Sequence, residues 1–266
     1  MSTPAASTRA TSAAPTTTQP TTTRPPTTPD YSRYSNTNLS WWYLPGSPTS
    51  QDKPAAIDAD VADLISDYDV IWRRTTSQKV VFLTMDEGYE FEQNSTRILD
   101  IAAAKNVTIT FFITGGFLKS HPDLVRRMLR EGHQVANHSE RHLRPPLALD
   151  SSTDTFVNDV RNLERDYLAM MGRPIARLYR PPEGGYSERS LKITQDLGYT
   201  TVFWSFAYAD WDTANQPDPA AARQKILGQL HPGSLLLLHT VSSTNVAILG
   251  EVIDGIRARG YVIGQL

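Results

Sequence analysis

Two hydrophobic periods alternate along most of the chain. Short apolar runs between turn residues predict buried strands, and apolar residues at helical spacing predict amphipathic helices. Strands are predicted at residues 79–85, 107–113, 133–137, 175–179, 200–207, 234–238 and 261–266. Helices are predicted between them, near residues 93–105, 121–131, 153–171, 187–197, 219–230 and 245–259. One more amphipathic helix is predicted within residues 55–72.

The regular alternation of strands and helices predicts an α/β fold with parallel strand pairing. No Gly-rich GxGxxG sequence follows the first long strand, which argues against a doubly wound, dinucleotide-binding sheet. About seven βα units favour a distorted (β/α) barrel instead.

Three regions are predicted along the chain. Residues 1–38 consist mainly of Thr, Pro, Ser and Ala, a composition typical of a disordered tether. Residues 39–77 are interpreted as a lead-in segment that packs on the outside of the barrel, and residues 78–266 as the catalytic domain. Thr/Pro tethers often join exported domains to an anchor, so we expect an extracellular or envelope-associated protein whose signal or anchor is not contained in this chain.

Composition excludes several classes of function. The 26 basic and 28 acidic residues nearly cancel, so neither nucleic acid nor anionic lipid is an expected partner, and a monomer is expected. The chain has no cysteine, so disulfides and thiolate ligands are excluded and any metal must use nitrogen or oxygen ligands. No apolar run approaches the roughly 20 residues of a membrane-spanning helix.

Polar residues capable of catalysis or metal binding follow five of the predicted strands. Barrel enzymes place their catalytic groups at these strand ends. Taken alone, each site also has an interpretation without a catalytic role: a solvated acidic turn, a chance histidine pair, a rigid surface loop or a structural histidine. The five sites are Asp86-Glu87-Gly88, His138 with His142, Arg180 to Gly184, Asp210-Trp211, and His239.

Together these residue types suit metal-assisted hydrolysis. One carboxylate of the Asp86-Glu87 pair can bind a metal while the other acts as a base. His138 and His142 share a face if their turn is helical, and imidazoles bind zinc and similar divalent ions. Arg180 and Asp210 are further candidates for orienting groups, because Arg180 can orient a carboxylate, whereas Asp210 can keep His239 protonated as a general acid.

The five motifs, read in order, resemble those of the polysaccharide deacetylase family, carbohydrate esterase family 4. They are TMDEG, HSERH, RPPEG, YADW and LLLLH, and the resemblance spans residues 78–266. Within the family the chain resembles in particular the muramic acid de-N-acetylases that act in δ-lactam synthesis in peptidoglycan. The segments NLSWWY, KVVFLTMDEGYE and HPGSLLLLHTVSSTN carry this narrower resemblance.

The resemblance implies roles for individual residues. Asp86 would be the general base, tuned by Arg180, and His239 the general acid, oriented by Asp210. The divalent metal, zinc ahead of cobalt, nickel, manganese or magnesium, would be held by Glu87, His138 and His142. The residues implied in substrate binding are Trp211, which would shape the acetyl pocket, and Pro182, Glu183, Gly184 and Leu237.

Three positions depart from the family pattern. Glu87 replaces the usual metal-binding Asp, where the δ-lactam subgroup tends to have Asn. Glu183 stands where that subgroup has an Arg suited to an anionic lactyl or peptide group, and its charge would repel such a group. Ala207 replaces an acidic residue of many glucosamine-directed members, a difference shared with the subgroup.

The expected function is removal of N-acetyl groups from a cell-wall glycan, with N-acetylmuramic acid in peptidoglycan favoured. One alternative keeps the chemistry but moves it to N-acetylglucosamine in peptidoglycan or chitin-like oligomers, or to an O-acetylated xylan. Another is a catalytically silent glycan-binding domain, suggested by Glu87 in the ligand position. A purely structural βα domain would leave the five strand-end sites unexplained.

Overall fold

The structure, a computed structural model, describes residues 1–3, 29–46 and 52–266. All helices and strands of these residues belong to one unit, Tyr31–Leu266. Most of the tether predicted over residues 1–38 lies outside the described residues. Its last part, however, is bound to the domain, because the Tyr31 hydroxyl donates to Asp196 at 3.2 Å and the Asn36 amide donates to Asp150 at 2.8 Å. The ordered domain therefore begins before residue 38.

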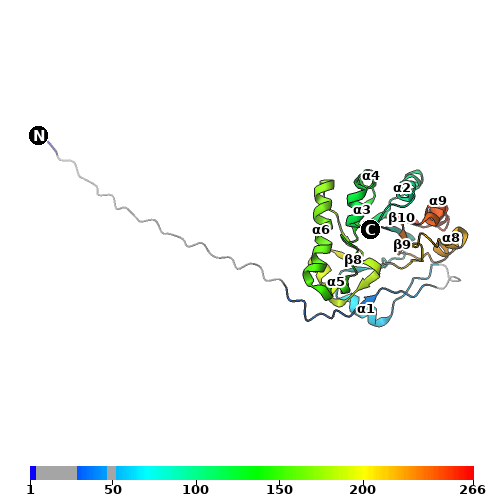
Figure 1. Cartoon of the computed structure of the whole chain (residues 1–266), viewed down its shortest axis with the longest axis horizontal. Helices are drawn as coiled ribbons and strands as arrows, with labels where there is room; N and C mark the ends of the chain where they lie inside the picture. The colour runs from blue at the N-terminus through cyan, green and yellow to red at the C-terminus, as the bar shows by residue number, and fades with distance from the viewer. Residues whose placement is uncertain (4–28, 47–51) are drawn as a thin grey trace. The chain divides into compact units, whose positions relative to one another are not determined.

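A curled parallel sheet forms the centre of the domain (Figure 1), which confirms the predicted barrel-like α/β fold. Its strands run in the order β10-β3-β4-β5-β6-β8-β2, and β9 pairs with β3. The bounds are β2 Val70–Ile71, β3 Val80–Glu87, β4 Thr110–Ile113, β5 Gln134–Asn137, β6 Ala176–Tyr179, β8 Thr200–Val202, β9 Ser234–His239 and β10 Val262–Gly264.

The barrel closes irregularly between β8 and β9. A single parallel bridge, Phe206 to Leu236, joins the segment after β8 to β9. The strand predicted over residues 200–207 is therefore too long: β8 ends at Val202, and the following residues bond to other partners. Ser205, for example, donates its backbone N–H to the carbonyl of Leu235 at 3.0 Å.

Helices surround the outside of the sheet (Figure 1). Those predicted from periodicity are present with small shifts of their ends, whereas α3 and α5 were not predicted. The helix predicted over 121–131 is α4, which starts at Pro122, where a missing backbone N–H costs nothing. The bounds are α1 Ala59–Ser66, α2 Asn94–Lys105, α3 Gly115–Ser120, α4 Pro122–Arg130, α5 Pro145–Ser151, α6 Thr153–Met171, α7 Glu188–Asp196, α8 Pro219–Gly228 and α9 Ser243–Ala258. None of the described helices is long and apolar enough to cross a bilayer.

The lead-in segment is integrated into the domain more deeply than an outer layer would be. Its strand β2 pairs with β8, and β1 (Leu39–Ser40) pairs with β7 (Gly185–Tyr186). Trp41 is buried and stacks on Phe203, with ring centroids 4.3 Å apart and planes 5° apart. The segment therefore covers the part of the sheet next to the irregular closure.

Candidate active site

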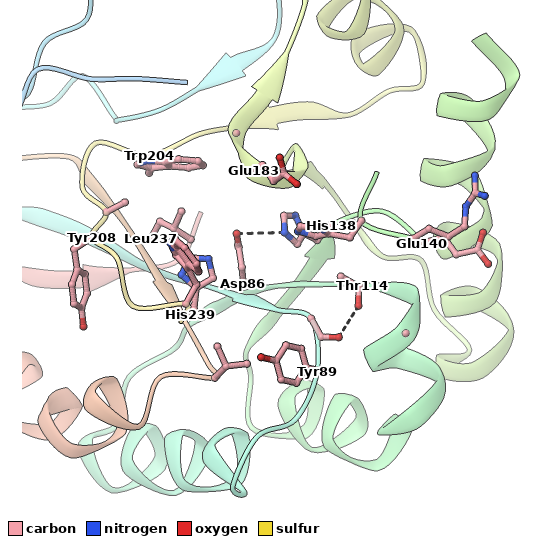
Figure 2. A pocket seen from close by; sticks show the side chains of 18 residues that line it. Asp86, Tyr89, Thr114, His138, Glu140, Glu183, Trp204, Tyr208, Leu237 and His239 are labelled. Carbon is pink, nitrogen blue, oxygen red and sulfur yellow. Dashed lines mark hydrogen bonds and ion pairs between the residues drawn. The ribbon is translucent and has the colours of Figure 1, made fainter. Parts of the chain in front are cut away.

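A cavity of about 900 Å³ opens at the carboxyl ends of the strands (Figure 2). This volume is within the usual range for small-molecule sites. Each of the five predicted strand-end motifs contributes at least one residue to its wall, and Arg180 lies just behind that wall. The predicted residues that line it are Asp86, His138, His142, Glu183, Gly184, Trp211, Leu237 and His239.

Asp86, near the end of β3, is held by the buried Arg180. The guanidinium donates to Asp86 Oδ1 at 2.7 Å and to the hydroxyl of Thr84 at 2.8 Å, and it lies 4.0 Å from the ring centroid of Phe112. Arg180 is fully buried behind the carboxylate, so it orients Asp86 without reaching the cavity. The second oxygen, Oδ2, lies 3.5 Å from His138 Nε2.

The charge state of Asp86 suits a general base. Burial alone would raise the pKa of this carboxyl group. The guanidinium of Arg180 opposes that effect, with smaller contributions from His138 and His239, and lowers the pKa below its usual value. Asp86 is therefore ionised at neutral pH and able to accept a proton.

His239 lies beside Asp86 because β3 and β9 are parallel neighbours, with Asp86 and His239 as register partners. Its ring Nδ1 donates to Asp210 Oδ1 at 2.7 Å, and its backbone N–H donates to Asp210 Oδ2 at 2.8 Å. Burial tends to lower the pKa of His239, but the hydrogen bond and charge of Asp210 outweigh it and raise the pKa above its usual value. Asp210 therefore favours the protonated form of the imidazole that faces the cavity next to an ionised carboxylate.

Asn245 completes the support of this histidine and was not predicted. Its amide donates to Asp210 Oδ2 at 2.6 Å and to the backbone carbonyl of His239 at 3.0 Å. The amide oxygen accepts from the hydroxyl of Tyr208, a residue of the cavity wall. Asn245 lies in the first turn of α9, where an Asn has no sequence signal that distinguishes a positioning role from a helix start.

The His138-to-His142 segment is a loop and not the helical turn on which the predicted shared face depended. Ser139 and His142 have positive φ, 67° and 58°, a conformation that costs energy for residues other than glycine. The loop is held by Asp159 of α6, whose carboxylate accepts the backbone N–H groups of Arg141 at 2.8 Å and Leu143 at 3.3 Å. Both imidazoles nevertheless line the cavity, with ring centroids 4.9 Å apart.

His138 has the bonding pattern of a neutral histidine with a free ring nitrogen. Its Nδ1 bonds the backbone carbonyl of Arg180 at 2.8 Å, which leaves Nε2 on the side of Asp86. Burial lowers its pKa to about 4, so the ring is uncharged at neutral pH. A neutral imidazole fixed through Nδ1 is suited to bind a divalent ion through Nε2.

Glu87 is not placed with the two histidines. Its side chain is fully buried, does not line the cavity, and accepts a hydrogen bond from Ser95 of α2 at 2.9 Å, while Oε1 has no hydrogen-bond partner. Successive residues of a strand point to opposite faces, so Glu87 points away when Asp86 faces the cavity. Among the described residues, no group of three or more His, Cys, Asp or Glu side chains is arranged to hold a metal. The donor set implied by the resemblance therefore does not fit the arrangement of these side chains.

Not all of the residues implied in substrate binding line the cavity. Trp211 is exposed at the cavity, and Leu237 and Gly184 form part of its wall. Pro182 is buried and is not part of the wall. Glu183 lines the cavity with a left-handed backbone, φ 57°, and its carboxylate lies 3.4 Å from Arg144.

Several wall residues were missed by the sequence reasoning. Tyr89 and Thr114 border the cavity on the side of β3 and β4, and Trp204 and Tyr208 border it on the side of β8 (Figure 2). Thr114 donates to the carbonyl of Gly88 at 3.0 Å, which ties the two loops together. Trp204 lies within the segment predicted as a buried strand, so its place in the wall had no signal in the apolar pattern, whereas Tyr208 follows that segment in the YADW motif.

The chain belongs to the polysaccharide deacetylase family, whose model matches residues 73–202. The chain is 36% identical over 231 residues to the peptidoglycan-N-acetylmuramic acid deacetylase PdaA of Bacillus subtilis, covering 87% of this chain and 85% of that protein. The solved structure of PdaA, a family 4 carbohydrate esterase, has a TM-score of 0.81 at 33% identity and covers 87% of this chain and 96% of that one.

A second relative carries the name peptidoglycan-N-acetylglucosamine deacetylase and comes from Bacillus cereus. It is 28% identical over 195 residues, covering 72% of this chain and 88% of that protein. The similarity therefore covers most of the domain, and the two relatives are named for different acetylated sugars. The chain is accordingly a member of a hydrolase family that deacetylates polysaccharides.

The burial of Glu87 predicts a pH-dependent gain in stability for Glu87→Gln. Burial raises the pKa of Glu87 well above its usual value. The folded protein therefore binds more protons than the unfolded chain above the unfolded pKa of 4.5, and stability falls as pH rises toward the folded pKa. Removal of this titration should raise the melting temperature relative to wild type at pH 7 to 8, and the gain should shrink toward pH 4.

The gain should grow by up to about 1.4 kcal/mol for each pH unit between the unfolded and the folded pKa. Thermal unfolding followed by circular dichroism at several pH values measures it. Glu92→Gln, at an exposed position near the start of α2, is the matched control. A Glu87→Gln variant that is less stable than wild type at every pH would contradict the burial argument.

Proposed function

We propose that this chain removes N-acetyl groups from peptidoglycan, with N-acetylmuramic acid as the acetylated sugar. The observation that carries the proposal is the pairing of an ionised Asp86 with a proton-bearing His239 in one cavity, each held by an oppositely charged buried partner. The name of the Bacillus subtilis relative supports the choice of sugar. The proposal includes action as a monomer on glycan and not on nucleic acid.

Asp86 acts as the general base in this reaction. A water molecule beside Oδ2 gives its proton to the carboxylate as its oxygen attacks the acetyl carbonyl carbon. Arg180 keeps the carboxylate ionised and oriented before the reaction, because its guanidinium holds Oδ1 at 2.7 Å and leaves Oδ2 available. The attack produces a tetrahedral carbon that still bears the sugar nitrogen.

His239 acts as the general acid. As the bond between the acetyl carbon and the sugar nitrogen breaks, the imidazolium transfers its proton to the nitrogen, so the products are acetate and a free amine. Asp210 favours the protonated form of this ring and fixes Nδ1, so that Nε2 is the nitrogen available for proton transfer. Trp211 and Leu237 form the apolar wall against which the acetyl methyl group packs.

N-acetylglucosamine is a second candidate for the acetylated sugar. Muramic acid differs by a lactyl group that bears a carboxylate or a peptide, and the acidic side chain of Glu183 lines the cavity. Glu183 is partly balanced by Arg144, which lies 3.4 Å away and reduces its repulsion of an anion. The Bacillus cereus relative is named a peptidoglycan-N-acetylglucosamine deacetylase, which supports this alternative.

The binding of a divalent metal ion is a separate part of the proposal. Deacetylases of this family are generally metal-dependent, and we propose that zinc, ahead of cobalt, nickel, manganese or magnesium, binds His138 and His142. Neutral imidazoles suit zinc, but a structural or catalytic zinc site has three or four protein ligands. With Glu87 turned toward Ser95, two imidazoles would hold the ion weakly.

Location at the cell surface is also a proposal. A peptidoglycan substrate requires export, and the Thr/Pro-rich composition of residues 1–38 is typical of tethers on exported domains. Fractionation of the source cells, with detection of the protein by antibody, tests it. Detection only in the cytosolic fraction would contradict it.

Released acetate and product mass test the main proposal. We expect purified protein supplied with divalent metal to release acetate from peptidoglycan, with loss of acetyl mass on muramic residues. Asp86→Asn, which keeps the side-chain shape but removes the base, should lose at least about 100-fold in rate. Mass loss on glucosamine would favour the second candidate. No release from any glycan would favour the catalytically silent binding domain.

The Asp210–His239 pair predicts a specific change in the pH profile. In wild type, deprotonation of His239 should reduce kcat/KM on the alkaline side, above the usual imidazole pKa of 6.5, because Asp210 raises the pKa of this ring. Asp86 and Arg180 also act on His239, in opposite directions, and both remain in the variant. Asp210→Asn should therefore move the alkaline limb to lower pH and reduce the maximum rate.

The kcat/KM profile from about pH 5 to pH 10 measures both effects. Asp212→Asn, two residues away in the loop after β8, is the matched control and should keep the wild-type profile. An alkaline limb that stays in place in Asp210→Asn would exclude His239 as the titrating acid.

Metal binding is expected to depend on the histidines and not on Glu87. Isothermal titration with zinc should give weak binding to wild type, loss of binding in His142→Ala, and a change of less than about twofold in Glu87→Gln. This follows because Glu87 is buried away from the imidazole pair. A loss of affinity in Glu87→Gln comparable to that in His142→Ala would show that Glu87 turns to the metal.

A further inference from the structure

Trp42 is a large exposed aromatic residue between two buried ones. Its side chain is 66% exposed, whereas Trp41 and Tyr43 are buried. Trp41 packs on Phe203, so the alternation of the lead-in segment fixes the direction in which Trp42 emerges. Neither burial nor hydrogen bonding in the described residues accounts for a tryptophan at this position.

The residues on both sides of Trp42 are hydrogen-bonded to the wall of the cavity. The backbone N–H of Trp41 donates to the carbonyl of Gly184 at 2.7 Å, and its indole N–H donates to the carbonyl of Trp204 at 2.9 Å. The hydroxyl of Tyr43 accepts the backbone N–H of Ala207 at 3.0 Å. Gly184, Trp204 and Ala207 all line the cavity.

Trp42 therefore lies on a segment whose neighbouring residues are hydrogen-bonded to the cavity wall. Its ring lies 6.1 Å from that of Tyr43, with 29° between the planes, and Tyr43 in turn contacts the wall at Ala207. Trp211 and Tyr89 are also exposed, and both belong to the cavity wall. Exposed aromatic residues thus occur both at the mouth of the cavity and on the adjoining lead-in segment.

We propose that Trp42 forms an outer sugar-binding subsite, in which the face of the indole packs against a sugar ring of the glycan strand outside the cavity. The inference rests on the proposed function, because a polymeric substrate must continue beyond the sugar that enters the cavity. An indole face offers a flat apolar surface with little conformational freedom to lose, which suits the apolar face of a sugar ring. Trp42 lies outside residues 73–202, the part matched by the family model.

The charged group that contacts the lead-in segment just before Trp42, Arg144, is already paired. Arg144 lies 3.4 Å from Glu183, an acidic residue of the cavity wall. Arg144 also donates to Ser40 at 2.7 Å and to the carbonyl of Leu39 at 2.9 Å, so its hydrogen-bonding groups are engaged by the lead-in segment. Recognition by Trp42 would therefore come from contact area and not from charge.

The test separates glycan binding from catalysis. Binding to purified peptidoglycan and to soluble glycan oligomers of increasing length is measured by cosedimentation and fluorescence titration in the Asp86→Asn background. Trp42→Ala should weaken binding to long oligomers by roughly threefold to tenfold, the range of one aromatic stacking contact, and leave binding to the shortest oligomer unchanged. Trp42→Phe should retain most of the affinity.

Leu44→Ala is the matched control, because Leu44 is a 46% exposed apolar residue of the same segment, two positions away. Equal affinity of Trp42→Ala and Leu44→Ala for long oligomers would overturn the subsite. A wild-type dimer that Trp42→Ala converts to a monomer in analytical ultracentrifugation would also overturn it, in favour of self-association.

The outcomes also separate this inference from the proposed function. Length-dependent binding through Trp42 in a protein that releases no acetate would support the subsite and contradict the deacetylase proposal. Acetate release with the same KM in wild type and Trp42→Ala at every oligomer length would support the deacetylase and contradict the subsite.

Discussion

The buried charge of Arg180 is the constraint on which the centre of the domain depends. An unpaired cation in a fully buried position would cost several kcal/mol, so its partners have to be present in the folded state. Asp86, Thr84 and the carbonyl of Val202 supply them, and these groups come from both β3 and β8. The side chain of Arg180 therefore fixes the general base, Asp86, and joins strands from distant parts of the curled sheet.

His239 is positioned by a second network that shares no hydrogen bond with the first. Strand register brings it next to Asp86, and Asp210 and Asn245 hold it through three hydrogen bonds. Because the base is paired with a cation and the acid with an anion, their pKa values are shifted in opposite directions within one cavity. This separation is what allows one group to accept a proton while its neighbour retains one.

Most of the fold and the key polar residues were predictable, because strand and helix periods are strong in this chain and catalytic groups follow the strands. Orientation was not predictable. Glu87 could be identified as a carboxylate at a strand end, but its direction depends on the alternation within β3 and on a hydroxyl partner, Ser95, supplied by the next helix. The conformation of the loop from His138 could not be predicted, because nothing in its sequence indicates that Asp159 holds it in a non-helical form.

The lead-in segment makes the folded domain larger than the stretch that the family model matches. The family model begins at residue 73, but β2 precedes it and pairs with β8, and Trp41 covers Phe203. A fragment cut at the family boundary would leave a strand edge and an aromatic core surface open to solvent, both of which promote association between molecules. The stretch matched by the family model and the folded domain thus have different limits along this chain.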